Sequence, residues 1–413
     1  MPETLELVSS TRNIFAEPHL PASKSICNRF LVLQQVSNGA IVPEIISDAD
    51  DSQKLHHLLS NKPEFADAGD GGTTFRFALA FFAASENYTG ILTGSERLKE
   101  RPQHLLIQAL RSLGAEITCL EKEGFAPVRI TGKKLNGGKI TIDAGVSSQF
   151  ITAILLVAPL LKSPLDIELQ GELVSSSYLE MTIDILRKSG VSIDYSGNNI
   201  HVGQANWNAA IFPVERDWSA ASYWYSMLAL ANRGSVFLRG LKLKSLQGDA
   251  ICASIFENLG VNSVQEETGI RLSKVPVKTE HIDLDASNFP DLVQTLVVVC
   301  VALKIKAKIS GLKTLRIKET DRINAMQQEL RKIKFDLILH KDDQLECSGL
   351  SPDFSKIFLV ETYNDHRMAM AFSALVTVVY KLAIRNPEVV SKSYPNFWKD
   401  VRESGISFAE LEG

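Results

Sequence analysis

Two sequence elements that recur about every seventy residues constrain the fold of this 413-residue chain more than any other feature. One is an amphipathic helix that ends, usually in glycine, just before a strand, as in "QALRSLGAEI", "DILRKSGVSI", "SIFENLGVNSV", "ELRKIKFDLIL" and "DVRESGISF". The turn position falls at Gly114, Gly190, Gly260, Lys334 and Gly405, so the steps are 76, 70, 74 and 71 residues. Glycine just past a helix end is typical of a left-handed C-cap, so each copy predicts a helix-to-strand turn.

The second recurring element is a polar cluster that leads into an apolar helix. Its copies begin near Ser23, Gly72, Ser147, Ser219, Pro290 and Asp365, and after the first gap the steps are 75, 72, 71 and 75 residues. Agreement of the two registers predicts an α/β protein of about six βαβαββ-like units, three in each of two domains. Each unit should have one buried and one half-exposed helix. We expect one domain at 19–216 and the other at 1–18 with 217–413.

The overall charge and the cysteines exclude several classes of protein. A formal net charge of −4 argues against a general nucleic-acid binder, which carries a basic excess. The five cysteines are scattered without a CxxC pair, so we expect buried thiols in a reducing compartment and no zinc site. The N-terminus lacks the pattern of a signal or transit peptide, and the apolar runs fall short of a membrane span. We therefore expect a cytoplasmic protein with no membrane or nucleic-acid partner.

The polar helix starts carry a local excess of positive charge. Because a helix N-terminus exposes unpaired N–H groups, it attracts anions, and cationic side chains beside it strengthen that attraction. The starts and adjoining loops contain nine such residues: Lys24, Arg29, Arg76, Arg101, Lys318, Arg322, His366, Arg367 and Lys392. Asp291 and Glu319 lie in the same stretches, as acid–base chemistry requires. This pattern indicates ligands that bear phosphate or carboxylate groups.

Each stretch also has a purely structural interpretation. "SKSICNR", "SSQF" and "SSSY" are ordinary capping sequences when taken singly, and "GGTTFR" lacks the ending of a Walker motif. "IKETDRINAMQQELRK" fits a solvated amphipathic helix with the i,i+3 pairs Glu319–Arg322 and Glu329–Lys332. His366 alone is typical of a structural histidine. Their occurrence at equivalent points of one repeat favours the ligand-binding interpretation.

A series of motifs in this chain resembles the 5-enolpyruvylshikimate-3-phosphate synthase family. In order they are "LPASKSICNRFLVL", "DGGTTFRF", "LTGSERLKERP", "SSQF", "GELVSSSYLEMT", "SLQGD", "FPDLVQT", "IKETDRINAMQQEL", "ETYNDHRMAMAFS" and "SKSYP". The resemblance spans Pro21 to about Trp398. It implies two inside-out α/β domains, with helices buried, sheets outside and the active site in the interdomain cleft. It also implies a monomer that needs no metal or cofactor.

The resemblance further implies roles for individual residues. The expected catalytic residues are Lys24, Asp291 and Glu319. Contacts to shikimate 3-phosphate are expected from Lys24, Ser25, Arg29, Ser147, Ser148, Gln149, Ser175, Tyr178, Asp291 and Lys318. Contacts to phosphoenolpyruvate are expected from Lys24, Gly72, Arg101, Gln149, Arg322, His366, Arg367 and Lys392.

In this family the enolpyruvyl group passes from phosphoenolpyruvate to the 5-hydroxyl of shikimate 3-phosphate, through a tetrahedral intermediate that releases phosphate. The reaction belongs to the shikimate pathway of aromatic amino acid biosynthesis, and enzymes of this family are the target of glyphosate. Asp70 and Thr314 stand where the family usually has asparagine. Two alternatives remain open: enolpyruvyl transfer to UDP-N-acetylglucosamine, and a non-catalytic anion-binding homologue. "LTGSERLKERPQ" lacks the reactive cysteine of the sugar-nucleotide enzymes.

Overall fold

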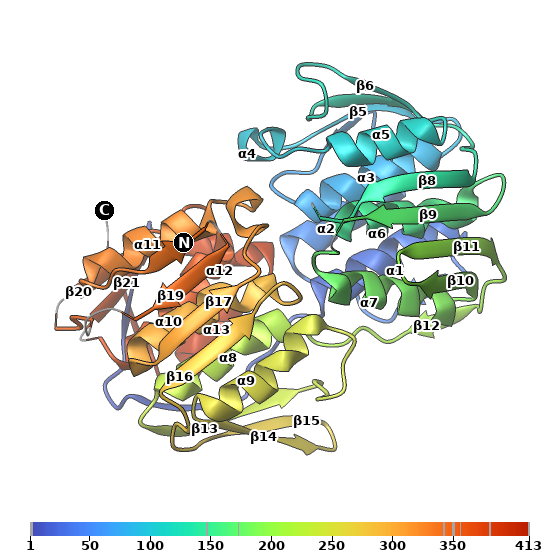
Figure 1. The fold of residues 1–413 in the computed structure, drawn as a ribbon. Coiled ribbons are helices and arrows are strands. Elements are labelled where there is room, and N and C mark those ends of the chain that lie inside the picture. Colours follow the sequence, from blue (N-terminus) through green and yellow to red (C-terminus); the bar gives the residue numbers. More distant parts are fainter. Residues whose placement is uncertain are drawn as a thin grey trace. The chain divides into compact units, whose positions relative to one another are not determined.

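The structure is a computed structural model in which the chain forms two units. It describes residues 3–145, 148–171, 173–341, 343–348, 352–355, 357–379 and 381–411. The continuous unit is Ala22–Val214, and the two-segment unit joins Met1–Pro21 to Glu215–Gly413. The units therefore change at 21/22 and 214/215, beside the boundaries of 18/19 and 216/217 expected from the sequence. Each unit has its own sheets and helices (Figure 1).

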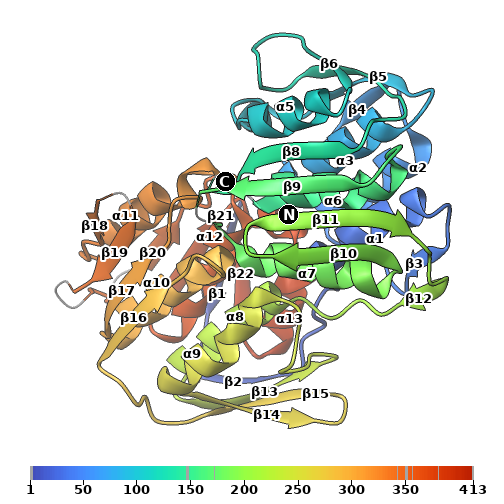
Figure 2. The ribbon, with the colours of Figure 1, turned by 45° about the vertical axis from the view of Figure 1, so that its right-hand side comes forward.

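The continuous unit contains two four-stranded sheets and one two-stranded sheet among its described residues. Their strand orders are β4 (Phe65–Asp67), β5 (Thr89–Thr93), β7 (Val128–Thr131), β6 (Glu116–Cys119); β10 (Val191–Ser196), β11 (Asn199–Ala205), β9 (Leu165–Gln170), β8 (Gly138–Asp143); and β12 (Ala210–Phe212), β3 (Ile41–Pro43). In both large sheets the first two strands along the chain are parallel and a hairpin completes the sheet. Figure 2 shows β8, β9, β11 and β10 as one layer.

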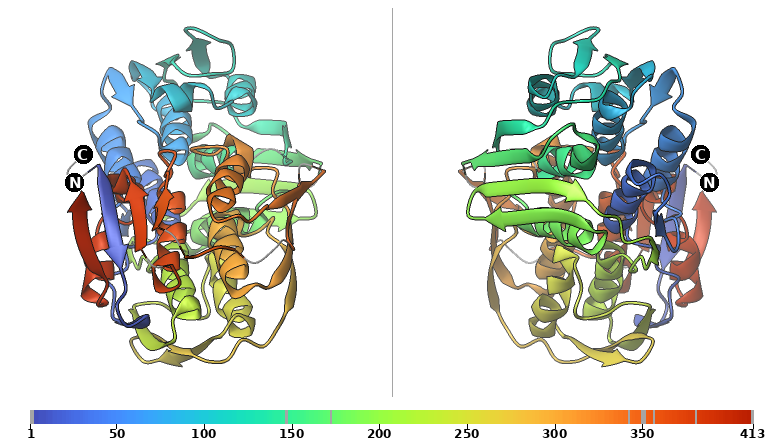
Figure 3. Two further views of the ribbon diagram at one scale, coloured as in Figure 1. Left: turned by 90° about the vertical axis from the view of Figure 1, so that its left-hand side faces the viewer. Right: turned by 90° about the vertical axis from the view of Figure 1, so that its right-hand side faces the viewer.

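Among its described residues, the two-segment unit contains three four-stranded sheets of the same kind. Their strand orders are β14 (Val261–Glu266), β15 (Gly269–Lys274), β13 (Arg233–Arg239), β2 (Asn13–Ala16); β16 (His281–Asp285), β17 (Lys306–Ser310), β19 (Gln344–Cys347), β18 (Ile338–His340); and β20 (Ile357–Val360), β21 (Lys381–Arg385), β1 (Thr4–Val8), β22 (Ser407–Leu411). The third sheet takes its β1 from the other end of the chain, between β21 and β22 (Figure 3, left).

The helices divide into an apolar and an amphipathic set, as the sequence predicts. The helices that follow the polar clusters are α1 (Lys24–Val36), α3 (Gly72–Ala84), α6 (Ser148–Val157), α8 (Trp218–Leu230), α10 (Val293–Leu303) and α12 (His366–Ser373). The others are α2 (Asp50–Asn61), α4 (Glu96–Lys99), α5 (His104–Ser112), α7 (Ser176–Lys188), α9 (Cys252–Asn258), α11 (Arg322–Lys332) and α13 (Phe397–Glu403). In the two-segment unit α8, α10 and α12 pack on one another and form the core, with the sheets at its edge (Figure 1).

The predicted helix-to-strand turns are confirmed at all five positions. Gly114, Gly190, Gly260 and Gly405 have φ between 93° and 95°, and Lys334 adopts the same left-handed region with φ of 60°. A side chain disfavours this region, which explains why glycine occupies four of the five positions.

One of the six predicted units departs from the common pattern. The sheet of β12 and β3 has two strands among the described residues, whereas the other five sheets have four. The step from Ser23 to Gly72 is 72 − 23 = 49 residues, against 71 to 75 for the other steps, and among the described residues it contains the helix α2 but no hairpin. Among the described residues, no helix combines the length and apolarity that a membrane span requires.

Candidate active site

Arg322 is the centre of the predicted site in the two-segment unit. It is the first residue of α11 and is only 1% exposed. Its Nε donates to Asp365 at 2.8 Å, one terminal nitrogen donates to Asp291 at 3.0 Å, and the other donates to Glu319 at 2.9 Å. One buried guanidinium therefore gathers three carboxylates from three separate chain segments. Both i,i+3 pairs expected of a solvated helix face are present, Glu319–Arg322 at 2.9 Å and Glu329–Lys332 at 2.7 Å, but Arg322 and Glu329 are themselves buried. A buried charge needs such partners.

Asp291 also contacts two further cations. Arg367 donates to its Oδ2 at 2.8 Å, and the Lys318 ammonium lies 3.8 Å from its Oδ1. Burial alone would raise the pKa of Asp291, but Arg367, Lys318 and Arg322 outweigh burial and hold that pKa well below its usual range. Asp291 is therefore an anion at neutral pH.

The start of α12 brings further predicted residues to this cluster. Asp365 is the N-cap of the helix, where its Oδ1 accepts the backbone N–H of Arg367 at 2.9 Å. His366 is buried, with Nδ1 3.9 Å from Asp365 Oδ1. Lys392 donates to the backbone oxygen of Asn364 at 2.7 Å. The predicted residues Asp291, Lys318, Glu319, Arg322, His366, Arg367 and Lys392 thus lie in one connected neighbourhood.

Two buried side chains extend the cluster beyond the predicted residues. The Tyr223 hydroxyl lies 3.2 Å from Arg367, and burial raises the pKa of Tyr223 to about 12. Asp249, from the quoted "SLQGD", accepts a hydrogen bond from the Ser219 hydroxyl. Burial and then the charge of Asp291 raise the pKa of Asp249 to about 7. Two neighbouring carboxyls thus have pKa values moved in opposite directions.

In the continuous unit, Gly72 and Arg101 lie against each other. A Cβ added to Gly72 would come within 2.7 Å of the Arg101 guanidinium. The Arg101 backbone oxygen accepts from Gln103 at 3.2 Å, and Gln103 accepts from Arg76 at 3.0 Å. Arg76 also donates to Gln149 near the start of α6. A chain of hydrogen bonds therefore connects two predicted phosphoenolpyruvate residues, Arg101 and Gln149.

A second group in this unit surrounds Arg29. Its three side-chain nitrogens donate to the Thr182 hydroxyl at 2.9 Å and to the backbone oxygens of Ser25 at 2.6 Å and Tyr178 at 3.0 Å. Burial lowers the pKa of Arg29 to about 10. Ser175, with φ of 61°, caps α7 one turn before Tyr178. Arg29 therefore fixes the backbone beside the predicted residues Ser25 and Tyr178.

The remaining predicted residues of this unit lie at helix starts. Lys24 opens α1, and its ammonium donates to Asp51 at 2.8 Å. Ser148 is buried at the start of α6. Ser147 lies outside the described residues.

Sequence reasoning missed the side chains that compensate the cations. The sequence gives no sign of the partners of Asp51 and Asp365, because Asp51 is 27 residues from Lys24 and Asp365 is 43 residues from Arg322. Tyr223 lies in the apolar run "WSAASYWYSML", where it cannot be told from a core aromatic residue.

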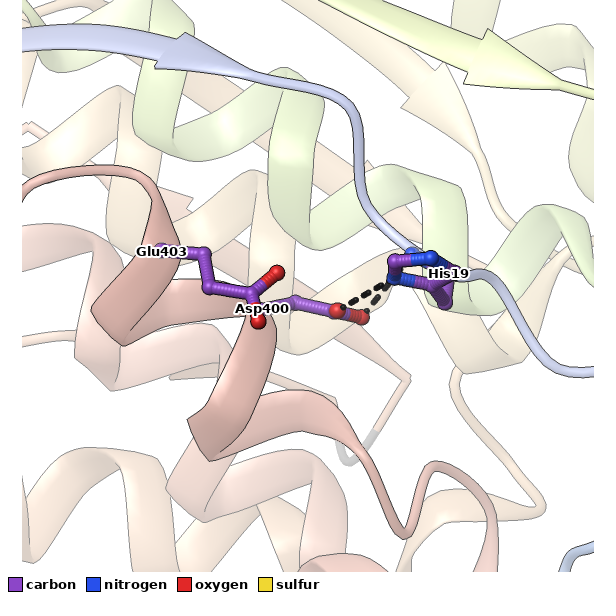
Figure 4. A group of neighbouring side chains, drawn as sticks. All are labelled: His19, Asp400 and Glu403. Atoms are coloured by element: carbon purple, nitrogen blue, oxygen red, sulfur yellow. Dashed lines mark hydrogen bonds and ion pairs between the residues drawn. The ribbon is translucent and has the colours of Figure 1, made fainter.

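One group of side chains among the described residues has the spacing of metal ligands. Donor atoms of His19, Asp400 and Glu403 lie within 4.8 Å of one another (Figure 4). Asp400 already accepts from the backbone N–H of His19 at 3.1 Å and from the Tyr394 hydroxyl at 2.5 Å, and His19 Nδ1 lies 3.2 Å from it. These bonds explain the group as an anchor between the amino-terminal segment and α13.

The site in the two-segment unit brings together the kinds of side chain that anion binding and proton transfer require. The positive groups Lys318, Arg322 and Arg367 surround Asp291, and the side chains of Asp291 and Glu319 are 16% and 17% exposed. A carboxylate beside fixed cations is able to exchange protons with an anionic ligand bound by those cations.

Comparison with known proteins agrees with this geometry. The sequence pattern of EPSP synthase (3-phosphoshikimate 1-carboxyvinyltransferase) matches residues 44–401. The chain is 42% identical to the 3-phosphoshikimate 1-carboxyvinyltransferase of Bacteroides fragilis, over 97% of this chain and 98% of that protein. It is 35% identical to that of Colwellia psychrerythraea, over 93% and 96%.

A solved EPSP synthase from Acinetobacter baumannii has the same fold, with a TM-score of 0.74 at 20% identity over 98% of this chain and 99% of that one. The fold, the clustered site residues and the match over most of the length lead to one conclusion. The chain belongs to the EPSP synthase (3-phosphoshikimate 1-carboxyvinyltransferase) family.

Proposed function

We propose that this protein transfers the enolpyruvyl group of phosphoenolpyruvate to the 5-hydroxyl of shikimate 3-phosphate and releases phosphate. The observation that carries the proposal is the Arg322 centre, which holds Asp291, Glu319 and Asp365 at 2.8–3.0 Å beside Arg367. The two substrates together bear two phosphates and two carboxylates. Fixed cations offset their mutual repulsion, and carboxylates among those cations move the protons.

The proposed proton transfers balance over the two steps. In the addition step, the 5-hydroxyl oxygen bonds to C2 of phosphoenolpyruvate, Asp291 takes the hydroxyl proton, and Glu319, which enters the step in its protonated form, donates its proton to C3. In the elimination step, C3 returns its proton to Glu319, the C2–O bond to phosphate breaks, and phosphate leaves with the proton held by Asp291. We propose that Lys24 shares in one of these transfers. Neither step requires an oxidant or a reductant.

The low pKa of Asp291 bears directly on its role as the base. Without substrate, Arg367 and Arg322 are hydrogen-bonded to Asp291 and stabilise its charged form. A substrate carboxylate or phosphate that competes for these cations weakens that stabilisation, and the pKa of Asp291 then rises. We propose that substrate binding thereby makes Asp291 a stronger base at the moment when a base is needed.

The continuous unit contributes residues that hold the substrates. We propose that Lys24, Ser25, Arg29, Ser147, Ser148, Gln149, Ser175 and Tyr178 contact shikimate 3-phosphate, and that Gly72, Arg101 and Gln149 contact phosphoenolpyruvate. The Arg76–Gln149 and Arg76–Gln103 hydrogen bonds support a pre-positioned Gln149. Because Arg29 already donates to three protein acceptors, its contribution includes holding Ser25 and Tyr178 in place.

Phosphate release from phosphoenolpyruvate tests the proposal. The purified protein is mixed with phosphoenolpyruvate and either shikimate 3-phosphate or UDP-N-acetylglucosamine in parallel. Phosphate release with shikimate 3-phosphate as the acceptor, but not with UDP-N-acetylglucosamine, supports the proposal. Release with the sugar nucleotide would reassign the acceptor, and no release with either would indicate an anion-binding homologue. A cytoplasmic location and a monomeric state stay predictions, and gel filtration tests the second.

A further inference from the structure

The backbone just before the "NDHR" stretch adopts an unusual conformation. Tyr363 and Asn364 are consecutive non-glycine residues with φ of 53° and 55°. Asparagine visits the left-handed region fairly often, but a bulky residue such as tyrosine rarely does. A turn of this kind persists only where surrounding contacts hold it. Asp365, the residue after the turn, is the N-cap that bonds to Arg322.

The contacts that hold the turn converge on Glu329 of α11. Its side chain is fully buried, and its Oε1 accepts the Tyr363 hydroxyl at 2.7 Å. Its Oε2 accepts the Lys332 ammonium at 2.7 Å and the backbone N–H of Glu361 at 3.1 Å. Burial first, and then the hydrogen bond to Glu329, raise the pKa of Tyr363, so the phenol stays a donor. Glu329 thus binds the segment both before the turn and at the turn.

The same helix contacts the segment on the other side of the turn. Arg322 and Glu329 are 329 − 322 = 7 residues apart, which is about two helical turns and puts them on one face. Arg322 bonds to Asp365, and Glu329 bonds to Tyr363. The left-handed turn is therefore fixed at both ends by one helix. Its Asn364 carbonyl also accepts the Lys392 ammonium at 2.7 Å.

We propose that Glu329 and Tyr363 are positioning residues for the reaction: they hold the left-handed turn that orients Asp365, Arg367 and the acceptor of Lys392. Neither side chain is among the residues expected to touch substrate. Two contacts depend on the backbone position that this turn sets: the one between Asp365 and Arg322, and the one between Arg367 and Asp291. The catalytic readout of this inference rests on the proposed function.

Three substitutions at Tyr363 separate the hydroxyl from the backbone conformation. Tyr363→Phe removes the donor to Glu329 and keeps the ring. Tyr363→Ala and Tyr363→Gly both remove the whole side chain, but only glycine adopts positive φ without strain. We expect Tyr363→Phe to lower kcat/KM for phosphoenolpyruvate about five- to tenfold, the scale of one lost hydrogen bond. Tyr363→Gly should retain more activity than Tyr363→Ala, although both lack the phenol.

Tyr225→Phe is the matched control. Tyr225 is a buried tyrosine of the same unit whose hydroxyl bonds to Ser263 at 2.8 Å, away from the Arg322 centre. The Tyr225→Phe variant should lower the unfolding temperature, as we also expect for Tyr363→Phe, but it should leave kcat/KM unchanged. Equal losses of kcat/KM in the two phenylalanine variants, or activity of Tyr363→Ala that equals or exceeds that of Tyr363→Gly, would overturn the inference.

Two further measurements keep the test decisive. If Tyr363→Phe does not fold, Glu329→Gln replaces it, since glutamine keeps the size and an acceptor oxygen but loses the charge. We expect a several-fold loss of kcat/KM, and wild-type kcat/KM in a folded Glu329→Gln protein would count against the inference. Calorimetric affinity for phosphoenolpyruvate, measured without shikimate 3-phosphate so that no reaction can proceed, needs no turnover. If wild-type protein binds phosphoenolpyruvate but releases no phosphate, the proposed function fails. The positioning role is then still tested, because the variants should rank in affinity for phosphoenolpyruvate as they were expected to rank in kcat/KM.

Discussion

Replacing Asp249 by asparagine should make stability less dependent on pH. Asp249 is 4% exposed and accepts a hydrogen bond from Ser219. Burial is the main cause that raises its pKa to about 7; the charges of Asp291 and Asp217 raise it further, and Arg367 and the Ser219 bond lower it. Asparagine has the same shape, still accepts from Ser219 and carries no charge at any pH.

The sign of the effect follows from comparing the folded and unfolded pKa values. The carboxyl titrates at 3.8 when unperturbed and at about 7 in the folded protein. Its contribution to stability is fully present below the unfolded pKa and is lost as pH rises through the folded pKa. A shift of about three units corresponds to roughly 4 kcal/mol of free energy of unfolding. Asp249→Asn should gain stability relative to wild type by up to this amount between pH 4 and pH 8.

Denaturant unfolding at pH 4.5, 6 and 8, followed by tryptophan fluorescence, measures the difference in free energy of unfolding between Asp249→Asn and wild type. Three of the four tryptophans, Trp218, Trp224 and Trp398, belong to the two-segment unit that contains Asp249. Asp336→Asn is the matched control, since it removes the same charge from a side chain that is 83% exposed. The difference in free energy of unfolding between Asp336→Asn and wild type should not change over this pH range. If the difference for Asp249→Asn does not grow toward pH 8, the folded protein does not raise the pKa of Asp249, and the reasoning is wrong.

Three substitutions test the proposed reaction by steady-state kinetics. Glu319→Gln should lower kcat by about two to four orders of magnitude while the fold is kept, the usual scale for a proton-transfer group; near-normal turnover would remove Glu319 from the mechanism. Asp70→Asn should lower the KM for phosphoenolpyruvate by removing a nearby negative charge, and a raised KM would mean that Asp70, which accepts from Ser95, orients its neighbours. Gly72→Ala places a methyl group against Arg101 and should raise the glyphosate inhibition constant more than the KM for phosphoenolpyruvate, because overpacking costs about 1–3 kcal/mol and the longer ligand has less room. Equal changes would show that Gly72 does not line the discriminating end of the pocket.

The sequence predicted features that are set by neighbours along the chain. The turns at Gly114, Gly190, Gly260 and Gly405 have a local cause, and so does the one at Lys334, where the surrounding helix and strand pattern reveals the turn without glycine. Polar helix starts were predictable for the same reason, since capping depends on residues two or three positions away.

The electrostatic partners were not predictable, because long-range packing decides them. "IKETDR" gave no sign that Arg322 is 1% exposed and bonded to Asp291 and Asp365, which are 31 and 43 residues away. The role of Asp249 depends on burial, and "SLQGD" contains no apolar pattern that would indicate it. The fold could therefore be derived from periodicity, whereas the charge pairing at the site required three-dimensional contacts.

The position of β1 has a consequence for how the chain is made. Thr4 of β1 pairs with Arg385 of β21, so these partners are 385 − 4 = 381 residues apart. Ribosomes add about 5–20 residues per second, so β1 waits roughly 20–80 seconds for its neighbours. The continuous unit has all its strands and helices before then. During synthesis β1 is an unpaired strand with both edges open to other chains. The interval before β21 and β22 emerge is therefore when the nascent protein is most exposed to aggregation, and chaperone binding to the first residues would be most useful then.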